Sequence, residues 1–84
     1  MSRALEIDAA RVVAVLYEQR AWFRHGLTDH HIAELTGLSI ECVILARRDA
    51  QADGLIEHVS RGGETVNMLT PLGVARSHAT GAPV

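Results

Sequence analysis

The sequence contains no lysine, one cysteine, two prolines and one each of Trp, Tyr and Phe. A single cysteine excludes an internal disulfide and fits the reducing cytoplasm, where we expect this protein to act. Because aromatic side chains are so scarce, the core must be aliphatic and rich in alanine. The longest apolar run near the N-terminus, Val12 to Leu16, is far too short to cross a bilayer, so we expect no membrane partner.

Basic charge is also scarce. All eight basic residues are arginines, and ten acidic residues outnumber them, which gives a net charge of −2. The strongly basic balance that supports nucleic-acid binding by itself is therefore absent. Any contact with DNA must come from a local cluster of arginines.

What is present is an apolar fraction of 48% over 84 residues, which is ordinary for a globular protein and argues against disorder. We expect residues 1–84 to form a single domain and the whole protein, with one modest core. Burial is marginal at this size, so a partner or a second copy would stabilise the fold.

Two helices joined by a tight turn are predicted in the middle of the chain. Thr28 is a suitable N-cap for a helix over 28–36, and Gly37 can end that helix in the left-handed conformation. Ser39 can cap a second helix over 39–53. The second helix carries an apolar stripe at helical spacing, formed by Val43, Ala46 and Ala50.

A longer helix is predicted before this pair. Apolar residues at steps of three and four indicate a helix over 4–25, with Gly26 as its C′ residue. Trp22 and Phe23 would then lie in its last turn.

A hairpin and a last helix are predicted after the pair. Alternating apolar and polar residues indicate strands over 55–59 and 65–69, joined by a glycine-containing turn over 60–64. Thr70-Pro71 then begins a helix over 71–79, because proline is well suited to the first helical position.

A set of residues and short segments, most of them at the junctions of these elements, carries a resemblance to a known domain: Leu35, Gly37-Leu38-Ser39, Val43, Gly54-Leu55-Ile56 and Leu69-Thr70-Pro71-Leu72-Gly73. Together they resemble a winged helix-turn-helix domain, closest in style to the MarR-type transcriptional regulators, over roughly residues 27–76. The last segment resembles the LTPxG motif that follows the wing in those proteins. The fold that we expect is α+β, with a three-helix bundle, a two-stranded β-wing and a short C-terminal helix.

The resemblance implies a sequence-specific transcriptional regulator of double-stranded DNA. Helix 39–53 would read the major groove, and wing 60–64 would follow the backbone. The residues expected to contact DNA are Thr28, Ser39, Ile40, Glu41, Ile44, Arg47, Arg48 and Arg61. The chain is too short for the long dimerisation helices of full MarR-type regulators, so monomer and homodimer both remain open.

The second helix also favours an alternative function. Ile44 and Leu45 lie on or near its outer side, and aliphatic side chains on an exposed face are more typical of a protein contact. The alternative is a winged-helix protein interaction or dimerisation module without DNA binding. Charge distinguishes the two functions: clustered arginines favour DNA, and acidic residues such as Glu41 among them favour a protein partner.

Metal and enzyme chemistry have little support. His25, His30, His31 and Cys42 lie close together in the sequence. His30 and His31, however, would point about 100° apart on a helix and could not easily share one metal. No spacing typical of zinc ligands and no catalytic triad or phosphate-binding glycine motif stands out. We therefore expect no metal, no cofactor, no catalytic residue and no enzymatic activity. A redox role is an alternative for the Cys42 thiol, because a position at a helix N-terminus can lower the pKa of a thiol.

Overall fold

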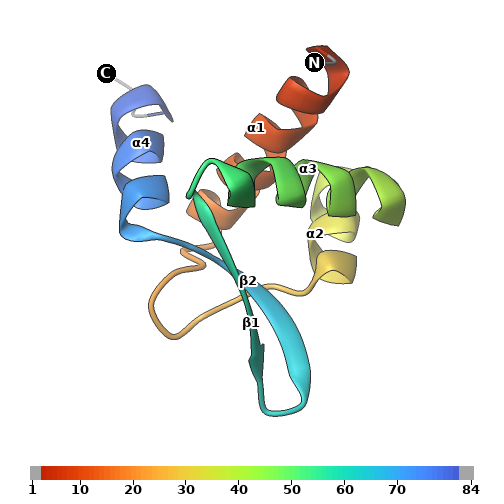
Figure 1. Cartoon of the computed structure of the whole chain (residues 1–84), viewed down its shortest axis with the longest axis vertical. Helices are drawn as coiled ribbons and strands as arrows, with labels where there is room; N and C mark the ends of the chain where they lie inside the picture. The colour runs from red at the N-terminus through yellow and green to blue at the C-terminus, as the bar shows by residue number, and fades with distance from the viewer. Residues whose placement is uncertain (1–2, 82–84) are drawn as a thin grey trace.

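The computed structural model describes residues 3–81, which form four helices and one two-stranded antiparallel sheet (Figure 1). The elements are α1 (Arg3–Glu18), α2 (Asp29–Thr36), α3 (Ile40–Ala52), β1 (Ile56–Arg61), β2 (Glu64–Leu69) and α4 (Pro71–Gly81). The hairpin of β1 and β2 projects away from the four helices, on the side opposite the start of α1 (Figure 1). The α+β class predicted from the sequence is confirmed.

The core lies between α1, α2 and α3. The apolar core residues with no exposed surface are Val12, Leu16, Ala21, Ile32, Val43 and Ala46. No aromatic residue belongs to the buried cluster, although Tyr17 and Trp22 pack against it in part. The aliphatic, alanine-containing core expected from the composition is therefore confirmed.

The first helix is shorter than predicted, because it ends at Glu18 and not at residue 25. The backbone turns at Arg20, whose φ of 55° is left-handed. The Arg20 N–H donates to the Tyr17 carbonyl at 3.1 Å, and the Ala21 N–H donates to the Leu16 carbonyl at 2.8 Å. These two bonds form a Schellman motif. The prediction was wrong because it sought glycine as the terminating residue, and arginine takes that position here.

The segment after α1 runs beside β2 and is not helical. Trp22 and Phe23 therefore lie in this loop and not in a last helical turn, as had been expected. Leu27 and Asn67 exchange both backbone hydrogen bonds, at 3.0 and 2.7 Å. Gly26 is needed for close packing and not as a helix terminus, since a Cβ there would lie 2.7 Å from a Val66 methyl group.

The hairpin is longer and its turn is tighter than predicted. The strands 56–61 and 64–69 pair in register from Ile56 opposite Leu69 to Arg61 opposite Glu64. The turn is only Gly62-Gly63, with φ values of +57° and +84°. Positive φ at both central residues is the requirement of the type I′ turn, which glycine meets without steric strain.

The last helix begins at Pro71, as predicted, and runs to Gly81. Thr70 caps it, because its hydroxyl accepts the Gly73 N–H at 3.0 Å. The Thr70 hydroxyl also donates to the Gly54 carbonyl at 2.6 Å, which ties the start of α4 to the end of α3.

Candidate functional site

The turn between α2 and α3 is built from local hydrogen bonds, as the sequence predicted. The Thr28 hydroxyl accepts the His31 N–H at 3.1 Å, and the Ser39 hydroxyl accepts the Cys42 N–H at 3.2 Å. Gly37 ends α2 with φ 77°, and its N–H donates to the Ala33 carbonyl. These caps fix where α3 begins and leave its N-terminus at the surface, since Ser39 is exposed.

The outer side of α3 is open to solvent over its length. Glu41, Leu45 and Arg48 are exposed at helical spacing, and Leu45 reaches 56%. Ile40 and Ile44 are half-buried at one edge of this surface. The surface thus offers one carboxylate, one guanidinium and a group of aliphatic side chains.

Arg47 does not belong to that outer surface. Its side chain is 8% exposed and forms a two-pronged ion pair with Asp29, with Nη2 3.2 Å from Oδ2 and Nε 3.4 Å from Oδ1. Its Nη1 also donates to the Gln51 side chain at 3.3 Å. The geometry assigns Arg47 to holding α3 against the start of α2, because its donors are used inside the fold.

Asn67 on β2 connects this ion pair to the hairpin, and its side chain is fully buried. Its Nδ2 donates to Asp29 Oδ1 at 2.8 Å and to the Leu27 carbonyl at 3.0 Å. Its Oδ1 lies 2.6 Å from Nδ1 of His58 on β1. Burial raises the pKa of Asp29, but the hydrogen bonds from Arg47 and Asn67 and the charge of Arg47 outweigh it and lower that pKa overall. These side chains form a polar network linking α2, α3 and both strands.

Sequence reasoning missed this network. An asparagine between apolar residues in the strand Val66–Met68 was the available signal, because a buried amide needs polar partners. Its partners Asp29 and Leu27 are about 40 residues away in the chain, so their identity could not be read from local spacing.

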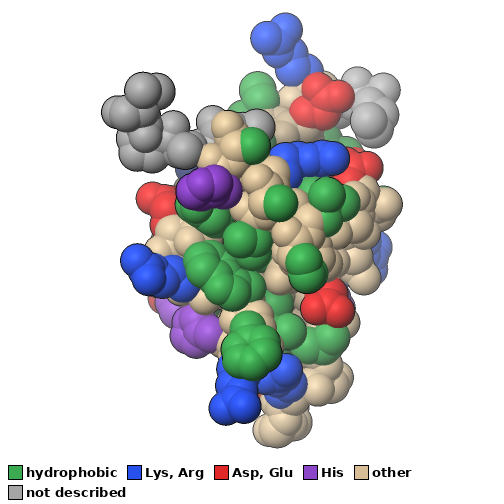
Figure 2. Space-filling model, turned by 90° about the vertical axis from the view of Figure 1, so that its left-hand side faces the viewer, with side chains coloured by type: hydrophobic (Ala, Val, Ile, Leu, Met, Phe, Trp, Pro, Cys, Tyr) green, Lys and Arg blue, Asp and Glu red, His purple; other side chains and the backbone are tan. Residues whose placement is uncertain are grey.

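Arg61 lies at the end of β1, next to the glycine turn, and is exposed. Its guanidinium donates at 3.4 Å to the carbonyls of Phe23 and Arg24 in the loop after α1. The Arg24 guanidinium lies 5.3 Å from the centre of the Phe23 ring, which is 75% exposed. In the view of Figure 2, basic side chains lie beside apolar ones at the hairpin end of the molecule. Arg61 therefore lies beside the loop that carries Arg24, whereas Arg47 is paired inside the fold and does not share this surface.

The eight residues expected to contact DNA are thus divided by the structure. Thr28 and Ser39 are helix caps, Arg47 is buried, and Arg61 is on the hairpin. The remaining four share the outer side of α3 or its edge: Ile40, Glu41, Ile44 and Arg48. Among residues 3–81, no group of three or more His, Cys, Asp or Glu side chains is arranged to hold a metal ion.

The chain matches no protein-family model, no curated protein and no solved structure. Within the part of the chain that the structure describes, no helix combines the length and the apolar character needed to cross a bilayer.

Proposed function

We propose that this protein is a winged helix-turn-helix DNA-binding protein that acts as a small transcriptional regulator in the cytoplasm. The observation that carries the proposal is the combination of an uncovered α3, presented by the capped turn after α2, with a projecting hairpin. A B-DNA major groove admits one α-helix, and residues near the N-terminus of such a helix meet base edges. The hairpin would be the wing.

In this proposal the contacts with phosphate come from three places. The N-terminus of α3 offers free N–H groups and the positive end of the helix dipole. Arg48 on α3 and Arg61 on the hairpin supply guanidinium groups. Ile44 can meet a thymine methyl group, and Glu41 can accept a hydrogen bond from cytosine. Arg47 is left out, because its donors already hold Asp29 and Gln51.

The test is a titration of the protein against random and genomic duplex DNA at two salt concentrations. Arg48→Ala and Arg61→Ala should each weaken binding and lower the slope of log affinity against log salt by about 1, since each removes one phosphate contact. Arg3→Ala is the matched control, because α1 begins at the end of the molecule opposite the hairpin (Figure 1).

Unchanged binding in both variants would overturn the contact assignment. Absence of any salt-dependent DNA binding by the parent protein would overturn the function itself. A Hill-type dependence on protein concentration, together with sedimentation, would decide between a monomer and a homodimer on the DNA.

A second function is favoured by one specific observation, the 56% exposure of Leu45 beside half-buried Ile44. Because the Arg47 guanidinium is paired with Asp29 inside the fold, the outer side of α3 carries one negative charge, on Glu41, and one positive charge, on Arg48. Such a surface suits a protein partner or a second copy of this chain. Leu45→Glu should abolish that association and leave the helix content unchanged by circular dichroism. An association unaffected by Leu45→Glu would exclude this function.

A further inference from the structure

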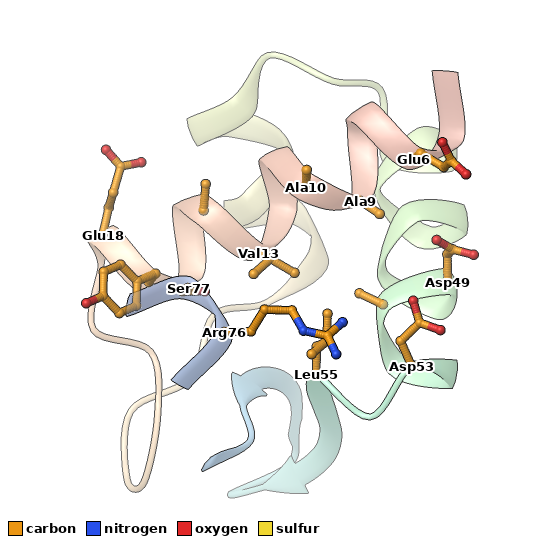
Figure 3. Close-up of a pocket in the computed structure, with 13 residues that line it drawn as sticks. Glu6, Ala9, Ala10, Val13, Glu18, Asp49, Asp53, Leu55, Arg76 and Ser77 are labelled. Carbon is orange, nitrogen blue, oxygen red and sulfur yellow. The ribbon is translucent and has the colours of Figure 1, made fainter. Parts of the chain in front are cut away.

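A pocket of about 600 Å³ lies between α1, the C-terminal half of α3, and α4 (Figure 3). Its apolar surface is made mostly of small side chains, together with the larger Tyr17 and Leu55; the small ones are Ala9, Ala10, Val13, Ala14 and Ala50. Pockets that bind small molecules typically measure about 300–1,000 Å³, are mostly apolar and carry a few polar groups. This pocket has both the size and the apolar lining of such a site.

The charged residues that line the pocket are mostly acidic. Glu6, Asp49 and Asp53 lie at the α3 end, and Glu18 lies at the opposite end (Figure 3). Arg76 extends over the pocket with its guanidinium toward the α3 end (Figure 3). Four carboxylates against one guanidinium leave the lining net negative, so a positively charged ligand is attracted and an anion is repelled.

Ser77 lines the pocket and is only 7% exposed. Its Oγ is buried, and no hydrogen-bond partner for it exists among the described residues. Because this oxygen has almost no surface open to solvent, a ligand in the pocket does not reach it, and the chemistry of the ligand is set by the apolar lining and the charge of the pocket.

We propose that the pocket between α1, α3 and α4 binds a small organic cation with an apolar body. The apolar part would cover the alanine-lined surface, and the cationic group would lie near Asp49 and Asp53. The proposal goes beyond the proposed function and does not depend on DNA binding. Asp49 and Ala50 belong to the helix proposed to enter the groove and Asp53 is its C-cap, so a bound ligand would contact that helix directly.

The test compares three molecules of nearly equal shape and different charge: phenylbutylammonium, phenylbutanol and phenylbutanoate. Each is titrated at neutral pH into the ¹⁵N-labelled full chain without DNA, and amide shifts are followed by NMR. The cation should give saturable shifts in residues 9–14, 49–55 and 76–77, with a Kd about tenfold lower than that of the alcohol. The carboxylate should bind more weakly than the alcohol.

Two variants with matched controls separate the charge from the shape of the site. Asp49→Asn should weaken binding of the cation several-fold toward that of phenylbutanol. Glu57→Gln removes an exposed carboxylate outside the pocket and should not. Ala10→Leu should fill the pocket and weaken all ligands, whereas Ala4→Leu, on the same helix but outside the lining, should not.

Equal binding of the three molecules, shifts centred outside the pocket, or no binding of the cation would each overturn the proposal. Each result is read without DNA, so failure here leaves the proposed function standing. Conversely, loss of DNA binding in Arg48→Ala would leave the pocket assignment untouched.

Discussion

Replacing Arg47 by methionine should destabilise the fold, because it leaves the Asp29 carboxylate without its ionic partner. Methionine keeps the length of the apolar stem and the helix propensity of the position. Asp29→Asn is the complementary change, since it leaves the Arg47 guanidinium without a charge partner but preserves the shape of the side chain. The double variant removes both charges.

The expected size follows from burial. The Arg47 side chain is 8% exposed and that of Asp29 is 18% exposed. Breaking a buried ion pair by removing one partner costs about 3–5 kcal/mol, and residual contact of Asp29 with water lowers this figure. We therefore expect each single variant to lose about 2 kcal/mol of unfolding free energy. The double variant should lose less than the sum of the two, by about 1–2 kcal/mol, as coupled hydrogen-bonded charges do.

Urea denaturation followed by circular dichroism measures these values, with DNA binding measured on the same samples. A loss of 2 kcal/mol corresponds to a fall in Tm of roughly 8–16 °C for a domain of this size. Unchanged stability with lost DNA binding in Arg47→Met would refute the reasoning, because it would return Arg47 to the phosphate contacts expected from the sequence. Additive losses in the double variant would show that the two side chains do not interact.

The same network gives a dependence on pH. Since the pKa of Asp29 is lowered from its ordinary 3.8 in the folded state, the carboxylate contributes stability that is fully present above that value. This contribution is lost as the pH falls below 3.8 through the folded pKa. In Asp29→Asn this part of the acid loss should disappear, which urea titrations between neutral and strongly acidic pH can measure.

Two further predictions concern helix ends. Gly73→Ala should destabilise the protein by about 1–3 kcal/mol, although alanine is the better helix former, because the new Cβ would lie 2.2 Å from the Leu55 carbonyl oxygen. Ala75→Gly, at an exposed position of the same helix, is the control and should cost about 1 kcal/mol through propensity alone, so stabilisation by Gly73→Ala would contradict the close contact. Ser39→Ala should cost about 1 kcal/mol through the lost cap on the Cys42 N–H, as thermal melting can check, and no loss would mean that the cap contributes nothing to stability.

The elements that could be predicted from the sequence are those whose ends are set by residues only a few positions apart. Thr28, Gly37 and Ser39 fix the ends of α2 and α3 through bonds to residues three or four positions away. Gly62-Gly63 sets the hairpin turn in the same local way. Local chemistry of this kind is present in the sequence itself, so these boundaries agree with prediction to within a few residues.

The candidate site likewise contains residues that the sequence placed correctly and one that only the packing of the helices could place. The sequence placed Leu45 and Arg48 on the outer side of α3, and they are exposed. It also offered Arg47 as a DNA contact, and only the packing of α2 against α3 brings Asp29 within 3.2 Å of that guanidinium. Its spacing of four from Val43 and three from Ala50 places Arg47 beside the apolar stripe, unlike Arg48, but the sequence does not show which carboxylate pairs with it.

The sequence by itself determined the α+β class, the middle helix pair with its caps, and the glycine hairpin, because each depends on residues a few positions apart. The end of α1 at Glu18 also depends on nearby residues, but an arginine in the left-handed position does not mark it in the sequence. Tertiary structure alone decided that Gly26 packs against Val66 and that Asn67 joins Asp29 to the hairpin. The physical reason is distance along the chain: these contacts join residues up to about 40 positions apart. Their energy depends on which side chains the completed core brings together.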